Sequence, residues 1–283
     1  MSNDVAAQVD SRSVATWRRI LSRTADGLTP LVDLYRPFVD GLDRLPADGR
    51  FLLVGNHTAF SAAEILLIPF FIRKTIGTRV RPLADHQFER VRGVQADLMA
   101  AYGAVIGLPE SAAALMRNDE TILVFPGGGR EIGKFKGEEY TLRWDNRYGF
   151  ARLAVEHQYP IVTVGLLGGD DVYTAISSRD GLWGRFSSRV TTRLTGRSDL
   201  AMPLTRGLGP TLIPRPQRMY LRFGTPIDTA PAGRSTEESH VAAVKDRVQH
   251  ELAATLRDLQ RIRAEDPYRH VNPLAWRAAS MPT

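Results

Sequence analysis

The hydrophobic pattern of the chain alternates between short continuous apolar runs and longer stretches with helical spacing. A continuous apolar run predicts a buried strand at residues 51–54, and further strands are predicted at 80–84, 105–107, 121–125, 161–167 and 219–223. Apolar positions three and four residues apart predict helices at 62–72, 111–117 and 148–157. Strands that alternate with helices predict an α/β fold, a single domain with a largely parallel central sheet flanked by helices. Functional loops are then expected at the strand ends.

Both ends of the chain carry helical patterns. Between residues 14 and 45, apolar positions interrupted by Gly27 and Pro37 predict two or three amphipathic N-terminal helices. Residues 235–238 (Ser-Thr-Glu-Glu) match a capping box and predict the start of a long packed C-terminal helix. Its apolar row is Val241, Val244, Val248, Leu252, Leu256 and Leu259. The expected organisation is a helical region at 1–45, an α/β domain at 46–228, and a helix and tail at 229–283.

The composition is that of a globular protein and narrows the chemistry. Hydrophobic residues make up 43% of the chain and charged residues 24%, which argues against disorder. The absence of cysteine excludes disulfides, thiolate catalysis and cysteine metal sites. No histidine cluster has metal-ligand spacing, so we expect no metal. The longest apolar run, residues 65–72, is shorter than a membrane span of about 18 residues, and no secretion signal is recognisable.

Positive charge is concentrated in one segment. Residues 176–222 contain nine arginines and only Asp180 and Asp199 as acids, so this segment accounts for the net charge of +6. Arg185, Arg189, Arg193 and Arg197 recur every fourth residue beside an apolar row, with Trp183 next to them; the row is Leu182, Phe186, Val190 and Leu194. This pattern predicts a helix in a membrane interface, attracted to anionic lipid. A solvated helix and a basic loop are the alternatives, and no module predicts nucleic-acid binding.

Two glycine-containing loops follow predicted strands. The first is Gly55-Asn56-His57, and the second runs from Phe125 to Glu131 with glycine at positions 127, 128 and 129. Successive glycines leave backbone N–H groups free to face an anion or a developing oxyanion, and Arg130 adds a planar donor. The spacing matches neither a phosphate-binding loop of nucleotide hydrolases nor a dinucleotide fingerprint. The loop is therefore either a ligand site or an ordinary turn.

Three ordered segments carry a family resemblance: residues 34–57, Phe125–Glu131 and residues 136–154. Together they resemble the glycerolipid acyltransferase superfamily, in particular the diacylglycerol-acyltransferase-like branch that includes plant phytyl ester synthases. The similarity extends from about residue 34 to about residue 228. It implies transfer of a fatty acyl group from acyl-CoA or acyl carrier protein to a lipid hydroxyl, without a cofactor. It also implies that His57 is the general base that removes the hydroxyl proton.

The acidic partner of His57 departs from the family pattern. Relatives place an acidic residue five or six positions after the histidine, whereas Ala62 and Ala63 stand there and Glu64 follows at seven. Glu64 therefore either orients His57 or closes a capping box with Ser61 at the helix start. Ser61 as an acyl-accepting nucleophile is a third reading, although the Gly-x-Ser-x-Gly context is missing.

The second loop bears on the acceptor. Lysophosphatidate-type relatives carry Pro-Glu-Gly-Thr-Arg at this position, while Gly127 and Gly129 replace the glutamate and the threonine here. The resemblance therefore implies a neutral acceptor, such as mono- or diacylglycerol or a long-chain alcohol. Arg130 could alternatively bind the phosphates of CoA. Glu131 is expected to hold Arg130 or a backbone turn.

Further expectations concern the surroundings of the site. Residues 144–147 are expected to form a structured turn near it. His86 follows a predicted strand and either lines the acceptor tunnel or makes a structural hydrogen bond. We expect a peripheral or monotopic membrane protein on the cytoplasmic side, not a secreted one. The alternatives are an acyltransferase for lysophospholipid acceptors and a catalytically impaired lipid-binding homologue. Nothing in the sequence predicts the oligomeric state.

Overall fold

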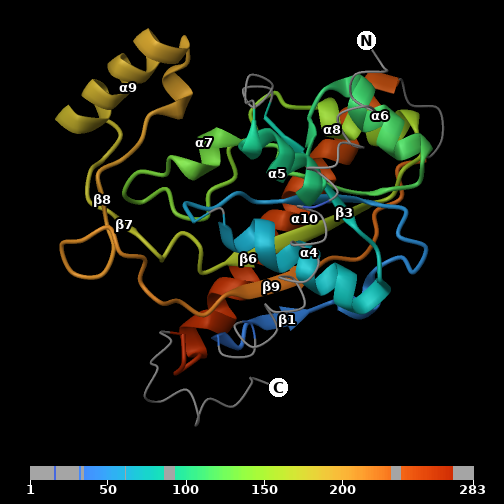
Figure 1. Cartoon of the computed structure of the whole chain (residues 1–283), viewed down its shortest axis with the longest axis horizontal. Coiled ribbons are helices and arrows are strands. Elements are labelled where there is room, and N and C mark those ends of the chain that lie inside the picture. The colour runs from blue at the N-terminus through green and yellow to red at the C-terminus, as the bar shows by residue number, and fades with distance from the viewer. Residues whose placement is uncertain are drawn as a thin grey trace.

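A seven-stranded sheet forms the centre of the protein (Figure 1). The computed structural model describes residues 16, 32, 35–60, 62–85, 93–230 and 237–269. The strands are β1 (Phe38–Asp40), β2 (Leu52–Gly55), β3 (Val80–Ala84), β4 (Val105–Ile106), β5 (Thr121–Val124), β6 (Ile161–Leu167) and β9 (Tyr220–Phe223). Their order is β1-β9-β6-β2-β5-β3-β4. Every neighbouring pair is parallel except β6 and β9, so the prediction of a largely parallel sheet is confirmed.

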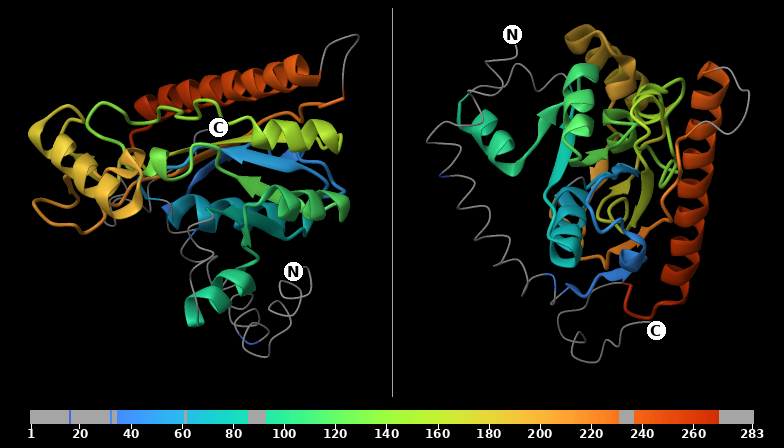
Figure 2. Two further views of the ribbon diagram at one scale, coloured as in Figure 1. Left: turned by 90° about the horizontal axis from the view of Figure 1, so that it is seen from above. Right: turned by 90° about the vertical axis from the view of Figure 1, so that its right-hand side faces the viewer.

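Helices cover both faces of this sheet (Figure 2). They are α4 (Ala62–Ile76), α5 (Val94–Tyr102), α6 (Pro109–Arg117), α7 (Gly129–Ile132), α8 (Gly149–Glu156), α9 (Leu182–Thr195) and α10 (Glu237–Glu265), with 3-10 turns η1 (Leu42–Arg44) and η3 (Ser198–Leu200). Helices α6, α8 and α10 pack with the sheet in one apolar cluster, and α4 packs in a second cluster on the opposite face. Two further strands, β7 (Thr174–Ala175) and β8 (Thr205–Arg206), pair outside this sheet.

The position of β2 in the sheet determines where the functional loops meet. Strands β2 and β6 are buried at every position, because helices cover both faces of the sheet at its centre. Strand β2 lies between β5 and β6 and is parallel to both. The carboxyl ends of these three strands therefore lie side by side, and the loops that follow them share one edge of the sheet.

The long C-terminal helix is confirmed. Helix α10 has 29 residues and packs along β6 and β9. All six residues of the predicted apolar row are buried. Ser235 and Thr236, which begin the predicted capping box, lie outside the described residues.

The prediction of helices up to residue 45 was wrong at Phe38–Asp40. This segment is strand β1, which pairs in parallel with β9. Pro37 before it has no amide hydrogen to donate, and Gly41 after it has a φ of 78°. Three residues are too few for apolar spacing to distinguish a strand from a helix. Most of the other residues in the predicted N-terminal helical region lie outside the described part of the chain, and residues 42–44 form only the 3-10 turn η1. Helix α5 was not predicted.

Candidate active site

Three loops meet at the edge where β5, β2 and β6 end. His57 lies in the loop after β2, residues 125–131 follow β5, and residues 168–171 follow β6. The backbone N–H of His57 donates to Oε2 of Glu131 at 2.8 Å, which joins the first loop to the second. The strand order thus brings together segments that are more than 100 residues apart.

The His57 imidazole contacts a buried carboxylate. Its Nδ1 lies against Oε1 of Glu64, whose side chain is fully buried in the first turn of α4. The same carboxylate accepts the backbone N–H of Thr58 at 2.8 Å and the Thr58 hydroxyl at 2.7 Å. The imidazole also stacks on Phe125, with ring centroids 4.6 Å apart. Nε2 forms no hydrogen bond to any described residue, so this nitrogen is open to a substrate.

The chain between His57 and Glu64 folds back, so that the two side chains meet despite the seven-residue spacing. A turn at Ala59 and Phe60 precedes α4 and brings the first turn of this helix back toward His57. The carboxylate of Glu64 binds the loop on which His57 lies, which is the contact required to orient the imidazole. Ser61, its partner in the predicted capping box and the candidate nucleophile, lies outside the described residues. His86 does too.

Glu131 holds the backbone of the site together. Its buried carboxylate accepts the N–H groups of His57 and Arg143, each at 2.8 Å. Burial raises the pKa of Glu131, and the hydrogen bond from the His57 N–H opposes that rise. A Cβ on Gly127 would lie 2.2 Å from Cδ of Glu131, and Gly128 has a φ of 53°. These two glycines are therefore required by the way the loop folds over Glu131.

Arg130 forms no ion pair with Glu131 among the described residues and is paired with other carboxylates. Its Nε donates to Asp199 at 2.6 Å, and its Nη1 is paired with Asp145. Asp199 is also paired with Arg197 at 2.8 Å. The hydrogen bond from Arg197, followed by that from Arg130, holds the pKa of Asp199 well below its usual range. Arg130 thus connects the glycine loop to η3 and to the turn at Asp145.

The turn at residues 144–147 lies next to the glycine loop, as predicted. Trp144 is fully buried, and Arg147 donates to the carbonyl oxygen of Pro126 at 3.1 Å. Residues 144–147 therefore form a structured turn beside the glycine loop. The described residues contain no group of three or more histidine, cysteine, aspartate or glutamate side chains that could hold a metal ion.

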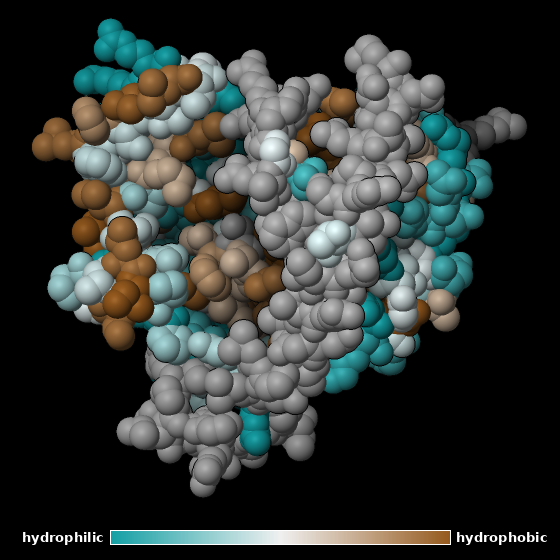
Figure 3. Space-filling view, viewed as in Figure 1, coloured by the Kyte–Doolittle hydropathy of each residue, from teal (hydrophilic) through white to brown (hydrophobic). Residues whose placement is uncertain are grey.

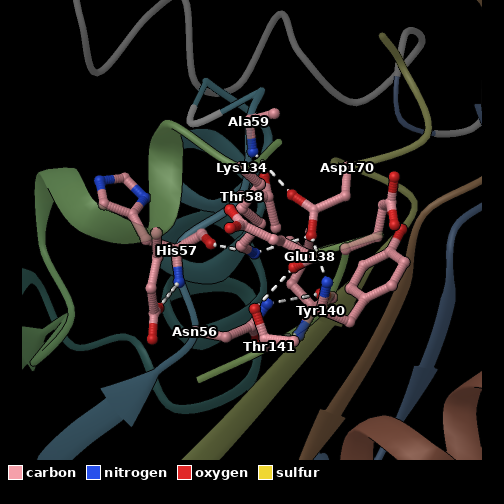
Figure 4. Close-up of polar contacts among 12 residues, drawn as sticks. Asn56, His57, Thr58, Ala59, Lys134, Glu138, Tyr140, Thr141 and Asp170 are labelled. Carbon is pink, nitrogen blue, oxygen red and sulfur yellow. Dashed lines mark hydrogen bonds and ion pairs between the residues drawn. The ribbon is translucent and has the colours of Figure 1, made fainter. Parts of the chain in front are cut away.

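A buried ion pair that the sequence analysis missed, Lys134 with Asp170, binds the backbone of the His57 loop (Figure 4). The side chains of Lys134 and Asp170 are 3% and 1% exposed, with Nζ and Oδ2 2.7 Å apart. Lys134 also donates to the carbonyl oxygen of His57 at 2.9 Å, and Asp170 accepts the N–H groups of Ala59 and Tyr140, each at 2.8 Å. The His57 imidazole projects away from this pair. The pair therefore positions the backbone of the loop and leaves the imidazole unobstructed.

One signal in the sequence could have identified half of this pair. Asp170 follows the predicted strand at 161–167 after two glycines. Like His57, it is a polar residue just after the end of a strand. Only the strand order, with β6 next to β2, shows that the two loops touch. Lys134 lies between two of the family-like segments and carries no pattern of its own.

The predicted arginine-rich helix exists as α9, with a correction at its end. Trp183, Arg185, Arg189 and Arg193 lie on this helix and are exposed. Arg197 does not belong to the row, because Gly196 ends the helix with a φ of 73°. Arg197 turns back and pairs with Asp199 and, at 3.7 Å, with Asp85. Side-chain spacing in the sequence could not show where the helix stops.

The segment that carries the His57 loop and the glycine loop resembles known proteins. The acyltransferase family matches residues 36–167, a range that contains His57, Glu64 and the glycine loop. Phytyl ester synthase 2 (chloroplastic) of Arabidopsis thaliana is 29% identical over 262 residues, which cover 83% of this chain and 36% of that protein. Phytyl ester synthase 1 (chloroplastic) of the same plant is 28% identical over 82% of this chain and 35% of that protein.

A third relative covers less of the chain. The DGAT1/2-independent enzyme synthesizing storage lipids of Homo sapiens is 30% identical over 125 residues, 44% of this chain and 37% of that protein. The chain thus spans about a third of the length of these curated relatives. The crystal structure of PlsC, the 1-acyl-sn-glycerophosphate acyltransferase of Thermotoga maritima, aligns over 89% of this chain and 87% of that one. The two chains are 18% identical, with a TM-score of 0.46. The match to the acyltransferase family therefore covers just under half of the chain, and this segment holds the candidate site.

Proposed function

We propose that the chain is an O-acyltransferase that moves a fatty acyl group from a thioester, acyl-CoA or acyl carrier protein, to the hydroxyl of a neutral lipid. The observation that carries this proposal is the contact between His57 Nδ1 and the buried carboxylate of Glu64, with Nε2 left open. A carboxylate at Nδ1 favours the tautomer in which Nε2 is unprotonated and able to accept a proton.

The proposed reaction needs one base and no protein nucleophile. Nε2 of His57 takes the proton of the acceptor hydroxyl while the oxygen attacks the thioester carbonyl carbon. A C–O bond forms, the carbonyl oxygen becomes an oxyanion, and collapse of this intermediate breaks the C–S bond. The imidazolium then returns the proton to the departing thiolate. Glu64 stabilises the imidazolium. The backbone N–H groups of Gly127 and Gly129 are the candidate donors to the oxyanion, because that of Gly128 donates to the carbonyl oxygen of Phe125.

The surroundings of Arg130 support a neutral acceptor. Its guanidinium is already paired with Asp199 and Asp145, so two carboxylates balance the charge that a phosphate-bearing acceptor would need. The similarity to phytyl ester synthases and to a storage-lipid enzyme points in the same direction. We therefore propose mono- or diacylglycerol or a long-chain alcohol as the acceptor class.

An acceptor panel tests this assignment. The purified chain is incubated with labelled acyl-CoA or acyl carrier protein and with monoacylglycerol, diacylglycerol, a long-chain alcohol or lysophosphatidate. We expect labelled ester from at least one neutral acceptor and little from lysophosphatidate. Product from lysophosphatidate alone would overturn the neutral acceptor. No product from any acceptor, with lipid binding retained, would instead identify a lipid-binding homologue.

Replacing Glu64 with glutamine tests the orientation of His57. The variant removes the charge that stabilises the imidazolium, and a hydrogen bond to a charged group contributes about 1.5–3 kcal/mol. We expect kcat to fall about 10- to 100-fold while KM for both substrates changes little. Steady-state kinetics on the acceptor found above gives both constants.

The matched control for this variant is Glu110→Gln, at an exposed position in the first turn of α6. We expect this control to behave like the wild type. Unchanged kcat in Glu64→Gln would show that Glu64 has only a structural role. An equal fall in both variants would show that the loss is not specific to the site.

A further inference from the structure

Exposed apolar side chains gather at one end of the molecule. Eleven of the fourteen large hydrophobic residues that are exposed in the described part of the chain lie between Ile176 and Ile213. Ten of these eleven occupy α9 and the segment 202–213, which lie together at one end of the protein (Figures 1 and 2). The space-filling view shows their apolar surface at the same end (Figure 3). We call α9 and residues 202–213 the α9 surface. Apolar clusters of this kind usually mark an interaction site.

Helix α9 turns its small residues toward the protein and its large apolar residues outward, which is the reverse of the usual arrangement for a helix in water. Its small residues face the protein: Gly184 is buried, and Ser187 is hydrogen-bonded to the backbone of Met202. A Cβ on Gly184 would lie 2.0 Å from the carbonyl oxygen of Arg179. Its large apolar residues face outward, with Leu182 91% and Leu194 80% exposed. A surface helix normally buries its apolar side, so this one requires another apolar phase.

The charges of the α9 surface indicate which phase that is. Arg185, Arg189 and Arg193 are exposed, and none of them forms an ion pair with another described residue. Arg206 on β8 is exposed as well. Guanidinium groups beside an apolar row match a lipid headgroup layer, in which the arginines meet phosphates and the apolar side chains enter the acyl boundary. A protein partner would not require an uncompensated basic row.

We propose that the α9 surface is the docking site for an anionic lipid membrane. This proposal does not depend on the chemistry proposed for His57, since it concerns binding alone. Among the described helices, none combines the length and apolar character needed to cross a membrane. Docking by a surface helix is the mode that α9 provides.

The α9 surface is continuous with the candidate active site. The 3-10 turn η3 follows α9 directly, and its Asp199 pairs with Arg130 of the glycine loop. A cavity of about 140 Å³ lies between the site loops and this segment, lined among others by Ala59, Lys134, Asp170, Ala175, Met202 and Thr205. A membrane held at the α9 surface would therefore lie beside the site that the acceptor must enter.

Vesicle flotation of the full chain tests the docking site. Vesicles are made of phosphatidylcholine alone or with about 30% phosphatidylglycerol. We expect the wild type to float with the anionic vesicles. Replacing Arg185, Arg189 and Arg193 with glutamine should weaken this binding on the order of 100-fold, and about 0.5 M salt should reduce the difference. Combining Leu182→Ser, Phe186→Ser and Leu194→Ser should weaken binding at least about tenfold at either salt concentration.

Matched controls lie outside the α9 surface. Arg247→Gln, Arg257→Gln and Arg261→Gln together remove three exposed charges of α10, and Leu108→Ser removes an exposed apolar residue. We expect both controls to float like the wild type. Flotation unchanged in the α9 variants, with native circular dichroism, would overturn the proposal. Concentration-dependent dimerisation without flotation would also overturn it and assign the surface to a second copy of the chain.

Discussion

Replacing His57 with glutamine is expected to lower kcat/KM for acyl transfer about 10²- to 10⁴-fold, the range by which a general base contributes. Glutamine can still form a hydrogen bond but cannot take up a proton from the acceptor. The His57 side chain is 13% exposed and its backbone contacts do not depend on the imidazole, so the fold should be retained. The rate is measured with labelled thioester and the acceptor identified by the panel, and the fold by circular dichroism.

His250 provides the matched control, because it is an exposed histidine on α10 far from the three loops. His250→Gln should leave kcat/KM unchanged. A folded His57→Gln variant with activity near that of the wild type would exclude His57 as the base. The same loss in both variants would point to a general effect of the substitution.

The second large effect concerns stability. Replacing Lys134 with methionine should lower the free energy of unfolding by about 3–5 kcal/mol, because Asp170 is then left buried without its counter-charge. The carbonyl oxygen of His57 also loses its donor. Urea unfolding followed by circular dichroism measures the change. We expect acyl transfer to fall as well, since the variant releases the backbone of the His57 loop.

Lys136 offers a control two residues away on the same segment, with an exposed side chain. Lys136→Met should change the free energy of unfolding by less than about 0.5 kcal/mol. Combining Lys134→Met with Asp170→Asn should recover part of the lost stability, because no buried charge then remains unpaired. A loss of less than about 1 kcal/mol in Lys134→Met alone would show that water reaches the pair.

The fold was largely predictable because its core is strongly patterned. Strand β6 is apolar at nearly every position, and α10 repeats its apolar residues at helical steps over several turns. The apolar spacing of such segments is visible within a short window of sequence, so the element can be predicted without knowing its neighbours in the fold. Strand β1 was mistaken for helix because three residues carry too little pattern, and its pairing with β9 decides its conformation.

The candidate site was predictable only in part. His57 and the glycine loop could be identified because both follow strongly patterned strands and lie in family-like segments. The contact of Glu64 with His57 depends on the turn at Ala59 and Phe60, which returns α4 to the loop. The Lys134–Asp170 pair depends on the adjacency of β2 and β6, which no local pattern contains.

The α/β class, the long C-terminal helix, and the concentration of arginines beside an apolar row in one segment follow from the sequence alone. These are consequences of periodicity and composition, which act over a few neighbouring residues. Only the tertiary structure decided that Arg130 is held by Asp199 and Asp145, that Arg197 leaves the arginine row, and that α9 faces outward. The position of Arg130 depends on carboxylates from two other segments, and the orientation of α9 depends on contacts such as the hydrogen bond between Ser187 and Met202. Which side chains come into contact is determined by the order of the strands and by where the helices end, and not by the spacing of residues along the chain.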